Sequence, residues 1–347
     1  MNRIKTFLFF VLILINILII YYKNNFYDSS KKILKNYILN INIRNIYINN
    51  KKPSLLIINN NNINYKIQFA ICSVAKQELL YIREFVDYYI KLGAKKIFLY
   101  DNNEINGENF DEILLEEVKN NYVEIINYRG LYKPQKKAYN DCYINNQNNF
   151  DWMAFLDIDE YLYLENNTNL IDFLSFPQFD NCNSILINWK YYGDNNHIYY
   201  EPKPIQERFL KPFNFPDYLN TSLFYAASKS IIRTKLNISW AHFPHYLKDS
   251  KICRPDGNKV HNPLSSPQYS RAYIKHYATK SLEEYLIKLF KGTVNSKFTL
   301  DSTSIIFWFK KYYFLFNTIT RKKKIYLKRN LNFEFGNYLF NNISISN

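Results

Sequence analysis

Three carboxylates stand close together after a short apolar run in the middle of the chain. Residues 152–156 have the length and composition of a buried strand, and Asp157, Asp159 and Glu160 follow at once. Carboxylates this close repel one another at pH 7 unless a cation offsets their charge. Oxygen-rich sites that share phosphate ligands suit Mg²⁺ or Mn²⁺, which can stabilise a leaving diphosphate as a Lewis acid. The alternative interpretation is a solvated acidic turn, because a single Asp-x-Asp triplet is a common pattern.

The elements before this cluster alternate between strand and helix patterns. Short apolar runs predict strands at 67–73, 96–100, 123–126 and 152–156. Helical spacing predicts helices at 75–92, 111–119 and 136–149, the first of them ended by Gly93. This alternation predicts the α/β class, with a mixed, mainly parallel sheet flanked by helices.

Ligands of such sheets bind outside the carboxyl ends of the strands. Asp101 follows the second predicted strand and Asp157 the fourth, so both carboxylates are expected at that edge. Lys280 and Ser281 precede an amphipathic pattern at 282–290, and a helix N-terminus there favours phosphate.

The composition limits the function classes. The 347 residues carry 45 Lys and Arg against 30 Asp and Glu, a formal net charge of +15, and 47% are hydrophobic. This apolar content argues against wholesale disorder, and only 7 Gly and 4 Cys exclude collagen and disulfide-rich scaffolds. The basic excess is typical of proteins that bind nucleic acid or a membrane surface. No nucleic-acid-binding motif accompanies it, so no nucleic-acid partner is expected. Scarce glycine also excludes a Gly-rich phosphate loop.

The N-terminal segment predicts one membrane anchor. Residues 6–22 are uncharged and apolar apart from Asn16, which suits a transmembrane helix. A cleaved signal peptide is the rival, but the bulky flank Tyr21-Tyr22 is a poor cleavage site. Basic residues on both sides leave the orientation open.

The predicted organisation has five parts. These are a short tail at 1–5, the anchor at 6–22, a stem or linker at 23–64, the main domain at 65–300, and an aromatic helix with a basic tail at 301–347. The basic run 321–324 suits either an anionic membrane surface or a solvated end.

The four cysteines form no Cys-x-x-Cys pair. Cys72, Cys142, Cys182 and Cys253 are more typical of buried thiols than of metal ligands, and one or two disulfides are compatible with an oxidising compartment.

Several blocks between residues 69 and 292 together resemble glycosyltransferase family 92 and the related family 2-like glycosyltransferases. Each block alone is weak, but they occur in the family's order. They are Ala75-Lys76-Gln77-Glu78 with Glu84-Phe85 and Leu92-Gly93; Phe98-Leu99-Tyr100-Asp101-Asn102; Gln135 with Ala138-Tyr139-Asn140-Asp141-Cys142; Asp157-Ile158-Asp159-Glu160-Tyr161; Trp189 with Gly193; Glu207-Arg208-Phe209; Lys229-Ser230-Ile231-Ile232-Arg233; His242; and His276-Tyr277 with Lys280-Ser281 and Glu284. Gln77 and Phe85 depart from the family's usual Asn and Trp.

The resemblance implies a membrane-anchored GT-A enzyme. Such an enzyme moves a sugar from a nucleotide-diphosphate donor, expected to be a UDP-sugar, to a hydroxyl of a glycan or glycoconjugate. Transfer would depend on Mn²⁺ or Mg²⁺ and invert the anomeric centre. In a eukaryote the chain would be a single-pass type II protein of the Golgi or ER, and otherwise membrane-associated.

The resemblance also implies roles for single residues. The metal ligands would be Asp157, Asp159 and His276. The donor would contact Glu78, Asp101 and Asp157 on its nucleoside side, and Lys229, Arg233 and Lys280 at its diphosphate. The base that deprotonates the acceptor would be Glu207, with Asp194 and Asp217 as rivals. Trp189, Tyr191 and Tyr192 would either stack on sugars or belong to the core.

Two other functions fit part of the pattern. One is a metal-dependent phosphohydrolase, although those enzymes carry Asp-x-Asp after the first strand. The other is a membrane-tethered carbohydrate-binding protein whose catalytic site has decayed.

Overall fold

The computed structural model describes residues 67–167, 169–214, 227–236, 245, 251–291, 313, 317 and 320–330. The predicted tail, anchor and stem at 1–5, 6–22 and 23–64 lie outside the described residues, as do Asp217, His242 and most of 301–347. Among the helices that are described, none has both the length and the apolar character to cross a membrane.

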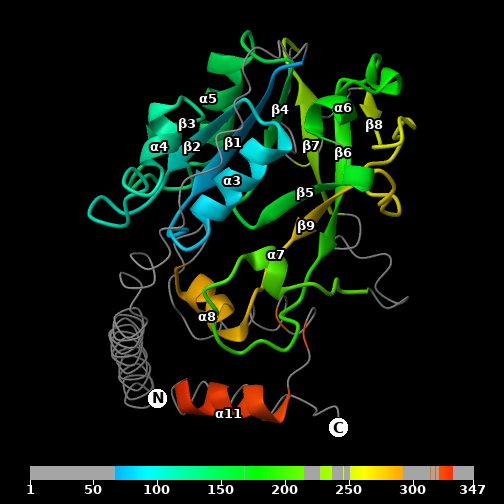
Figure 1. Ribbon diagram of the computed structural model, residues 1–347. Helices are drawn as coiled ribbons and strands as arrows, with labels where there is room; N and C mark the ends of the chain where they lie inside the picture. The colour runs from blue at the N-terminus through cyan, green and yellow to red at the C-terminus, as the bar shows by residue number, and fades with distance from the viewer. Residues whose placement is uncertain are drawn as a thin grey trace, which may run out of the picture.

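A mixed sheet forms the centre of the molecule (Figure 1). Its strand order is β3-β2-β1-β4-β7-β6-β9-β5, and β8 pairs with β6. The strands are β1 (Phe69–Ala75), β2 (Lys96–Asp101), β3 (Val123–Asn127), β4 (Trp152–Phe155), β5 (Glu160–Leu164), β6 (Ser184–Tyr191), β7 (Ser228–Arg233), β8 (Ile252–Cys253) and β9 (Ala272–His276). The four strands at the β3 end are mutually parallel, whereas β4–β7, β6–β7 and β5–β9 are antiparallel. The predicted mixed, mainly parallel α/β sheet is confirmed.

Helices cover both faces of the parallel half. The helices are α3 (Ile82–Leu92), α4 (Leu115–Lys119), α5 (Gln135–Asn146), α6 (Leu170–Leu174), α7 (Ile205–Arg208), α8 (Leu282–Lys291) and α11 (Arg321–Asn330), with short 3₁₀ turns at Glu165–Asn167 and Pro177–Phe179. Phe85 of α3 packs in one core cluster with Ile71 of β1, while Tyr139 of α5 packs in a second cluster with Cys72. Because neighbouring residues of β1 point to opposite faces, α3 and α5 lie on opposite sides of the sheet.

The first helix starts later than predicted. The pattern over 75–92 predicts one continuous helix, but β1 runs on to Ala75 and α3 begins at Ile82. Gln77 has a left-handed φ of 52°, which a helix cannot continue through, and its N–H donates to Asn103 Oδ1 at 2.7 Å. Gly93 ends the helix as predicted, with φ of 112°.

All four cysteines are in disulfides. Cys72 of β1 is joined to Cys142 of α5, and Cys182, just before β6, is joined to Cys253 of β8. The first bridge fixes α5 on the sheet. The second bridge fixes the short β8 beside β6.

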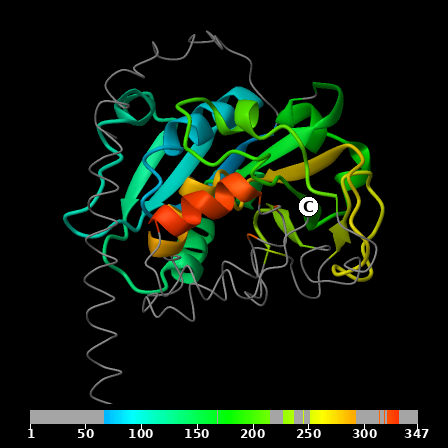
Figure 2. The same cartoon turned by 90° about the horizontal axis from the view of Figure 1, so that it is seen from below.

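The C-terminal helix packs against the domain through a buried carboxylate. Asp194 is 3% exposed, and Lys323 of α11 and the Tyr313 hydroxyl both bind its Oδ2. Tyr313 also packs against Tyr285 of α8, with ring centroids 5.2 Å apart. Seen from below, the red helix α11 stands in front of α8 (Figure 2). Within the basic run 321–324, Lys323 is therefore fully buried, which neither sequence interpretation anticipates.

The disulfides give a stability prediction. Replacing both Cys72 and Cys142 by Ala should lower the free energy of unfolding by about 4 kcal/mol, because a loop of this length is no longer closed in the unfolded chain. The matched control replaces Cys182 and Cys253 by Ala, whose sequence separation is 71 against 70. Denaturant titrations should show a similar loss in the free energy of unfolding for the two double variants. A first variant as stable as the parent would contradict the expectation.

Candidate functional site

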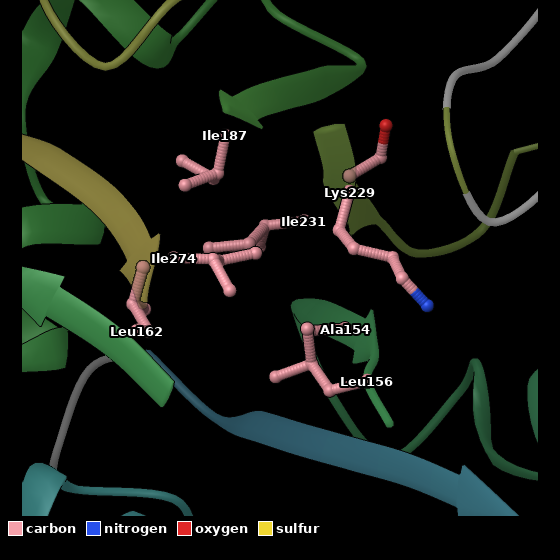
Figure 3. Close-up of a pocket in the computed structure, with 8 residues that line it drawn as sticks. Ala154, Leu156, Leu162, Ile187, Lys229, Ile231 and Ile274 are labelled. Atoms are coloured by element: carbon pink, nitrogen blue, oxygen red, sulfur yellow. The ribbon is translucent and has the colours of Figure 1, made fainter. Parts of the chain in front are cut away.

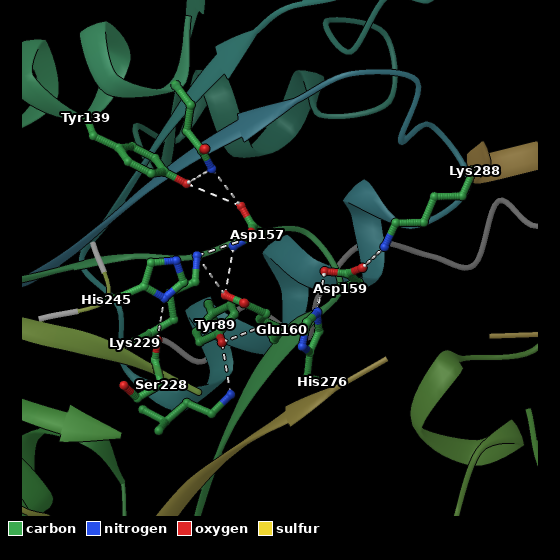
Figure 4. Close-up of polar contacts among 12 residues, drawn as sticks. Tyr89, Tyr139, Asp157, Asp159, Glu160, Ser228, Lys229, His245, His276 and Lys288 are labelled. Atoms are coloured by element: carbon green, nitrogen blue, oxygen red, sulfur yellow. Dashed lines mark hydrogen bonds and ion pairs between the residues drawn. The ribbon is translucent and has the colours of Figure 1, made fainter. Parts of the chain in front are cut away.

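The reversal of strand direction after β4 assembles the site. The turn Asp157-Ile158-Asp159 joins β4 to β5. Because β7 is antiparallel to β4, with Ala154 opposite Ile231, β7 begins where β4 ends and brings Lys229 to this turn. Likewise β9 is antiparallel to β5, and His276 lies opposite Glu160. Figure 4 shows these side chains converging from different elements.

Asp157 is held on both oxygens. Its Oδ1 accepts hydrogen bonds from Gln135 Nε2 at 3.2 Å and Tyr139 Oη at 3.4 Å, both on α5. Its Oδ2 lies 3.0 Å from Lys229 Nζ. The side chain is 38% exposed, so this carboxylate stands at the open side of the cluster.

Lys229 and Glu160 form the buried floor of the cluster. Glu160 is fully buried and 3.4 Å from Lys229 Nζ, and its Oε2 accepts the Asp157 N–H at 3.0 Å. Burial raises the pKa of Glu160, and Lys229 opposes that shift. Burial by itself would lower the pKa of Lys229, but Asp157 and Glu160 outweigh it and raise that pKa, so the lysine stays charged.

Asp159 is surrounded by two lysines and a histidine. Its Oδ2 lies 2.6 Å from Lys288 Nζ of α8 and 3.9 Å from Lys280 Nζ, and its Oδ1 lies 3.6 Å from His276 Nε2. Burial alone would raise the pKa of Asp159. Lys288, His276 and Lys280 together hold it well below its usual range, so the carboxylate is charged.

His276 is enclosed by aromatic rings. Its ring centroid is 4.4 Å from that of Trp189 and 5.2 Å from that of Tyr191, and burial lowers its pKa, so the imidazole is neutral at pH 7. Tyr191 and Tyr192 are buried in the core. The core interpretation holds for Tyr191 and Tyr192, whereas Trp189 is half-buried and packs beside the histidine.

A buried ion pair positions α8, which carries Lys288. Arg208 of α7 forms two hydrogen bonds to Glu284, at 2.7 and 2.9 Å, and Tyr81 Oη donates to the same carboxylate at 2.7 Å. Glu284 also accepts the Ser281 N–H at 3.1 Å, while Ser281 Oγ accepts the Glu284 N–H at 3.2 Å. This reciprocal capping box starts α8 directly after Lys280.

Two of the three predicted metal ligands lie side by side. Asp159 Oδ1 and His276 Nε2 are too far apart for a hydrogen bond but close enough to bind one ion together. His276 Nδ1 is buried without a hydrogen-bond partner in the described chain. Asp157 does not join them, because Lys229, Gln135 and Tyr139 occupy its oxygens. Across the described residues, no three His, Cys, Asp or Glu side chains form a metal-binding group. The pair Asp159–His276 fits two ligands of an ion whose other ligands come from phosphate or water.

Asp101 lies at the predicted edge, apart from the main cluster. It ends β2, and β1 separates it from β4, which places the two backbones about 10 Å apart. Its Oδ2 is 2.7 Å from Arg129 and its Oδ1 accepts the Asn103 N–H at 2.9 Å. Glu78 lies in the turn after β1, and its charge adds to that of Asp159 in raising the pKa of Lys288.

One predicted site residue, Arg233, does not reach the cluster. Arg233 lies four residues beyond Lys229 on β7, about 13 Å along the strand. Its guanidinium donates to the carbonyls of Cys182 and Phe179, at the far end of β4 from the Asp157–Asp159 turn, and the expected diphosphate contact stays a prediction. Glu207 lies on the exposed side of α7, next to the buried Arg208. The carboxylate of Asp194, the other described candidate for the base, binds Lys323 and the Tyr313 hydroxyl.

One small cavity lies beneath the cluster (Figure 3). Apolar side chains of β4, β5, β6, β7 and β9 line it together with the stem of Lys229, and its volume of about 10 Å³ holds roughly one water molecule. The ammonium of Lys229 points away from the cavity, toward Asp157. This cavity is too small for a sugar.

Sequence reasoning missed Lys288 and the pair Arg208–Glu284. Lys288 is four residues after Glu284, so helical spacing places both on the same face of α8. The Ser-x-x-Glu pattern at 281–284 is itself a helix-start signal. Neither pattern indicates which distant residue they meet.

The Arg208–Glu284 pair gives a second stability prediction. Glu284→Gln should lower the free energy of unfolding by about 3–5 kcal/mol, because it leaves the buried guanidinium without its counterion. Glu116→Gln is the control, since Glu116 and its partner Lys119 are both more than half exposed, and it should change stability by less than about 0.5 kcal/mol. Urea titrations at pH 7 measure both. Equal, small effects would show that the buried pair contributes nothing.

Comparison with solved structures finds S. aureus TarS. Its crystal structure matches 77% of this chain and 46% of the TarS chain, at 15% identity and a TM-score of 0.33. A structure of TarS residues 1–349 in complex with UDP-GlcNAc matches 48% of this chain and 45% of that chain, at 16% identity and a TM-score of 0.30.

Sequence comparison finds plant relatives and a family. A glycosyltransferase family 92 protein of Oryza sativa subsp. japonica is 28% identical over 106 residues, which cover 30% of this chain and 18% of that protein. One from Arabidopsis thaliana is 27% identical over 99 residues, covering 28% and 17%. The aligned part of the chain thus spans less than a fifth of either relative. The model of glycosyltransferase family 92 matches residues 65–311, most of the chain, and the protein therefore belongs to this family.

Proposed function

We propose that the protein is a GT-A glycosyltransferase that moves a sugar from a UDP-sugar to a hydroxyl of a glycan or glycoconjugate. The observation that carries the proposal is the cluster around Asp157 and Asp159 at the carboxyl end of β4, where α/β sheets bind their ligands. Family membership supports the reaction class.

Positive charge surrounds the place where the diphosphate would lie. Lys229 contacts Asp157, and Lys280 and Lys288 contact Asp159. A diphosphate that leaves the anomeric carbon gains negative charge, and fixed ammonium groups stabilise that charge in the transition state. These lysines serve as its electrostatic partners in the proposed reaction, together with a metal ion.

We assign the divalent ion, Mn²⁺ or Mg²⁺, to Asp159 and His276. When bound, it would supply Lewis-acid stabilisation of the diphosphate. Asp157 would contact the donor's ribose, because its partially exposed carboxylate faces the open side of the cluster. Asp101 and Glu78 would contact the nucleoside.

Inverting transfer needs one base. In the proposed step the acceptor oxygen forms a bond to the anomeric carbon, the bond from that carbon to the phosphate oxygen breaks, and UDP leaves. The acceptor's proton passes to a carboxylate, for which Glu207 is the candidate. Glu207 is exposed and lies next to Arg208, which ties α7 to α8.

The proposal includes membrane attachment. Residues 6–22 would anchor the chain as a single-pass type II protein, and 23–64 would form the stem before the domain at 65–300. Two disulfides support an oxidising compartment such as the Golgi or ER lumen.

The first functional test removes the charge of Asp159. Asp159→Asn in the full chain should lower kcat for sugar transfer from UDP-sugars with Mn²⁺ by about 100-fold or more, because the site loses electrostatic stabilisation of the leaving group. Asp172→Asn, at the exposed start of α6, is the control and should transfer normally. UDP release and product formation measure both. Binding of UDP-sugar by the parent without transfer or hydrolysis would instead favour a carbohydrate-binding protein.

The second functional test concerns the base. Glu207→Gln should lower kcat by about 100-fold or more with little change in donor binding, since the amide cannot accept the acceptor's proton. Gln206→Glu, which leaves Glu207 in place, controls for disturbance of α7. Undiminished transfer by Glu207→Gln would remove Glu207 from the mechanism.

A further inference from the structure

Lys288 occupies one side of the carboxylate that the proposed metal ion needs. Its Nζ lies 2.6 Å from Asp159 Oδ2 and 3.0 Å from the Ala278 carbonyl. The other oxygen of Asp159 faces His276 at 3.6 Å. A lysine ammonium and a divalent ion carry the same sign of charge, so both cannot approach this carboxylate without repelling each other.

The attachment of Lys288 allows it to leave Asp159. The backbone of α8 is fixed by the capping box at Ser281 and by the Arg208–Glu284 pair, so the stem starts from a rigid point. Its side chain is 33% exposed, whereas that of Asp159 is 10% exposed. The flexible stem can therefore turn its ammonium toward solvent or toward an incoming anion, while the carboxylate stays in place.

Lys280 is a weaker competitor at the same oxygen. Its Nζ is 3.9 Å from Asp159 Oδ2, beyond hydrogen-bond distance, and it lies over the Tyr81 ring, 4.4 Å from the centroid. Its side chain is only 5% exposed. Displacement by an ion thus acts first on Lys288.

We propose that the Lys288 ammonium competes with the divalent ion for Asp159. When the ion binds and displaces it, the ammonium binds the donor's diphosphate instead. The inference rests on the proposed function, because it needs a metal ion and a nucleotide diphosphate at this site. The ion alone binds weakly, since it must separate the Lys288–Asp159 pair. The diphosphate offers the displaced ammonium a new partner, so ion and nucleotide strengthen each other's binding.

The test measures Mn²⁺ binding without turnover. Full-length protein in detergent, freed of metal, is titrated with Mn²⁺ by calorimetry, with and without UDP. In Lys288→Met, Mn²⁺ alone should bind about tenfold more tightly than in the parent, and UDP should improve Mn²⁺ binding less than in the parent. The metal-free variant should also melt at a lower temperature, because Asp159 has lost a counterion, and Mn²⁺ should restore much of that loss.

The matched control is Lys275→Met. Lys275 precedes His276 on β9, is also partly buried, and contacts Gln206 at 3.5 Å. Adjacent residues of a strand point to opposite faces, so this variant removes a neighbouring charge without touching Asp159. Its Mn²⁺ affinity should equal that of the parent. Lys288→Gln, which can still donate a hydrogen bond to Asp159, replaces Lys288→Met if the latter does not fold.

Equal or weaker Mn²⁺ binding in the Lys288 variants would overturn the inference, as would an equal gain in Lys275→Met. Transfer assays in EDTA and in Mn²⁺ distinguish failure of the role of Lys288 from failure of the proposed metal dependence. Transfer that requires Mn²⁺, combined with unchanged Mn²⁺ affinity in Lys288→Met, removes the role of Lys288 alone. Transfer that persists in EDTA, with no Mn²⁺ bound by any variant, removes the metal from the proposed function and the inference with it.

Discussion

Neutralisation of the carboxylates on the turn after β4 is the constraint on which the site depends. Asp159 and Glu160 are almost completely removed from water, and a buried carboxylate without a partner is strongly unfavourable. The chain supplies lysine ammonium groups from β7, from the residue before α8 and from α8 itself. Lysines from distant parts of the chain thus supply positive charge beside these carboxylates, while the divalent ion stays a prediction.

The sheet topology meets the same requirement. An all-parallel sheet would bring only the carboxyl ends of strands to the Asp157–Asp159 turn. With β7 reversed, the beginning of a strand reaches it, and Lys229 arrives there with its stem packed on the sheet. The end of β9 places His276 beside Glu160. Arg208 and Glu284 then determine how α8 lies against the domain, and so where Lys288 points.

Local sequence signals predicted the parallel half of the sheet. The other half depends on pairing between residues far apart in the sequence, which local signals do not reveal. The runs at 96–100 and 123–126 correspond to β2 and β3, because strand length and apolar composition are local properties. Lys229 and Arg233 stand on one strand and are equally basic, yet only the antiparallel register with β4 decides which of them meets Asp157. The late start of α3 depends on Gln77, whose left-handed backbone is stabilised by Asn103, 26 residues away. No local pattern encodes such partners.

The buried contact between Asp194 and α11 determines when the domain can be completed. Lys323 is synthesised long after its partner Asp194, and Asn317 joins the same region to Thr279, the neighbour of Lys280. During synthesis the sheet can form while Asp194 still lacks its counterion. The region that carries Lys280 therefore gains this buried contact only after residue 323 has been synthesised, later than the strands β1 to β9 of the sheet.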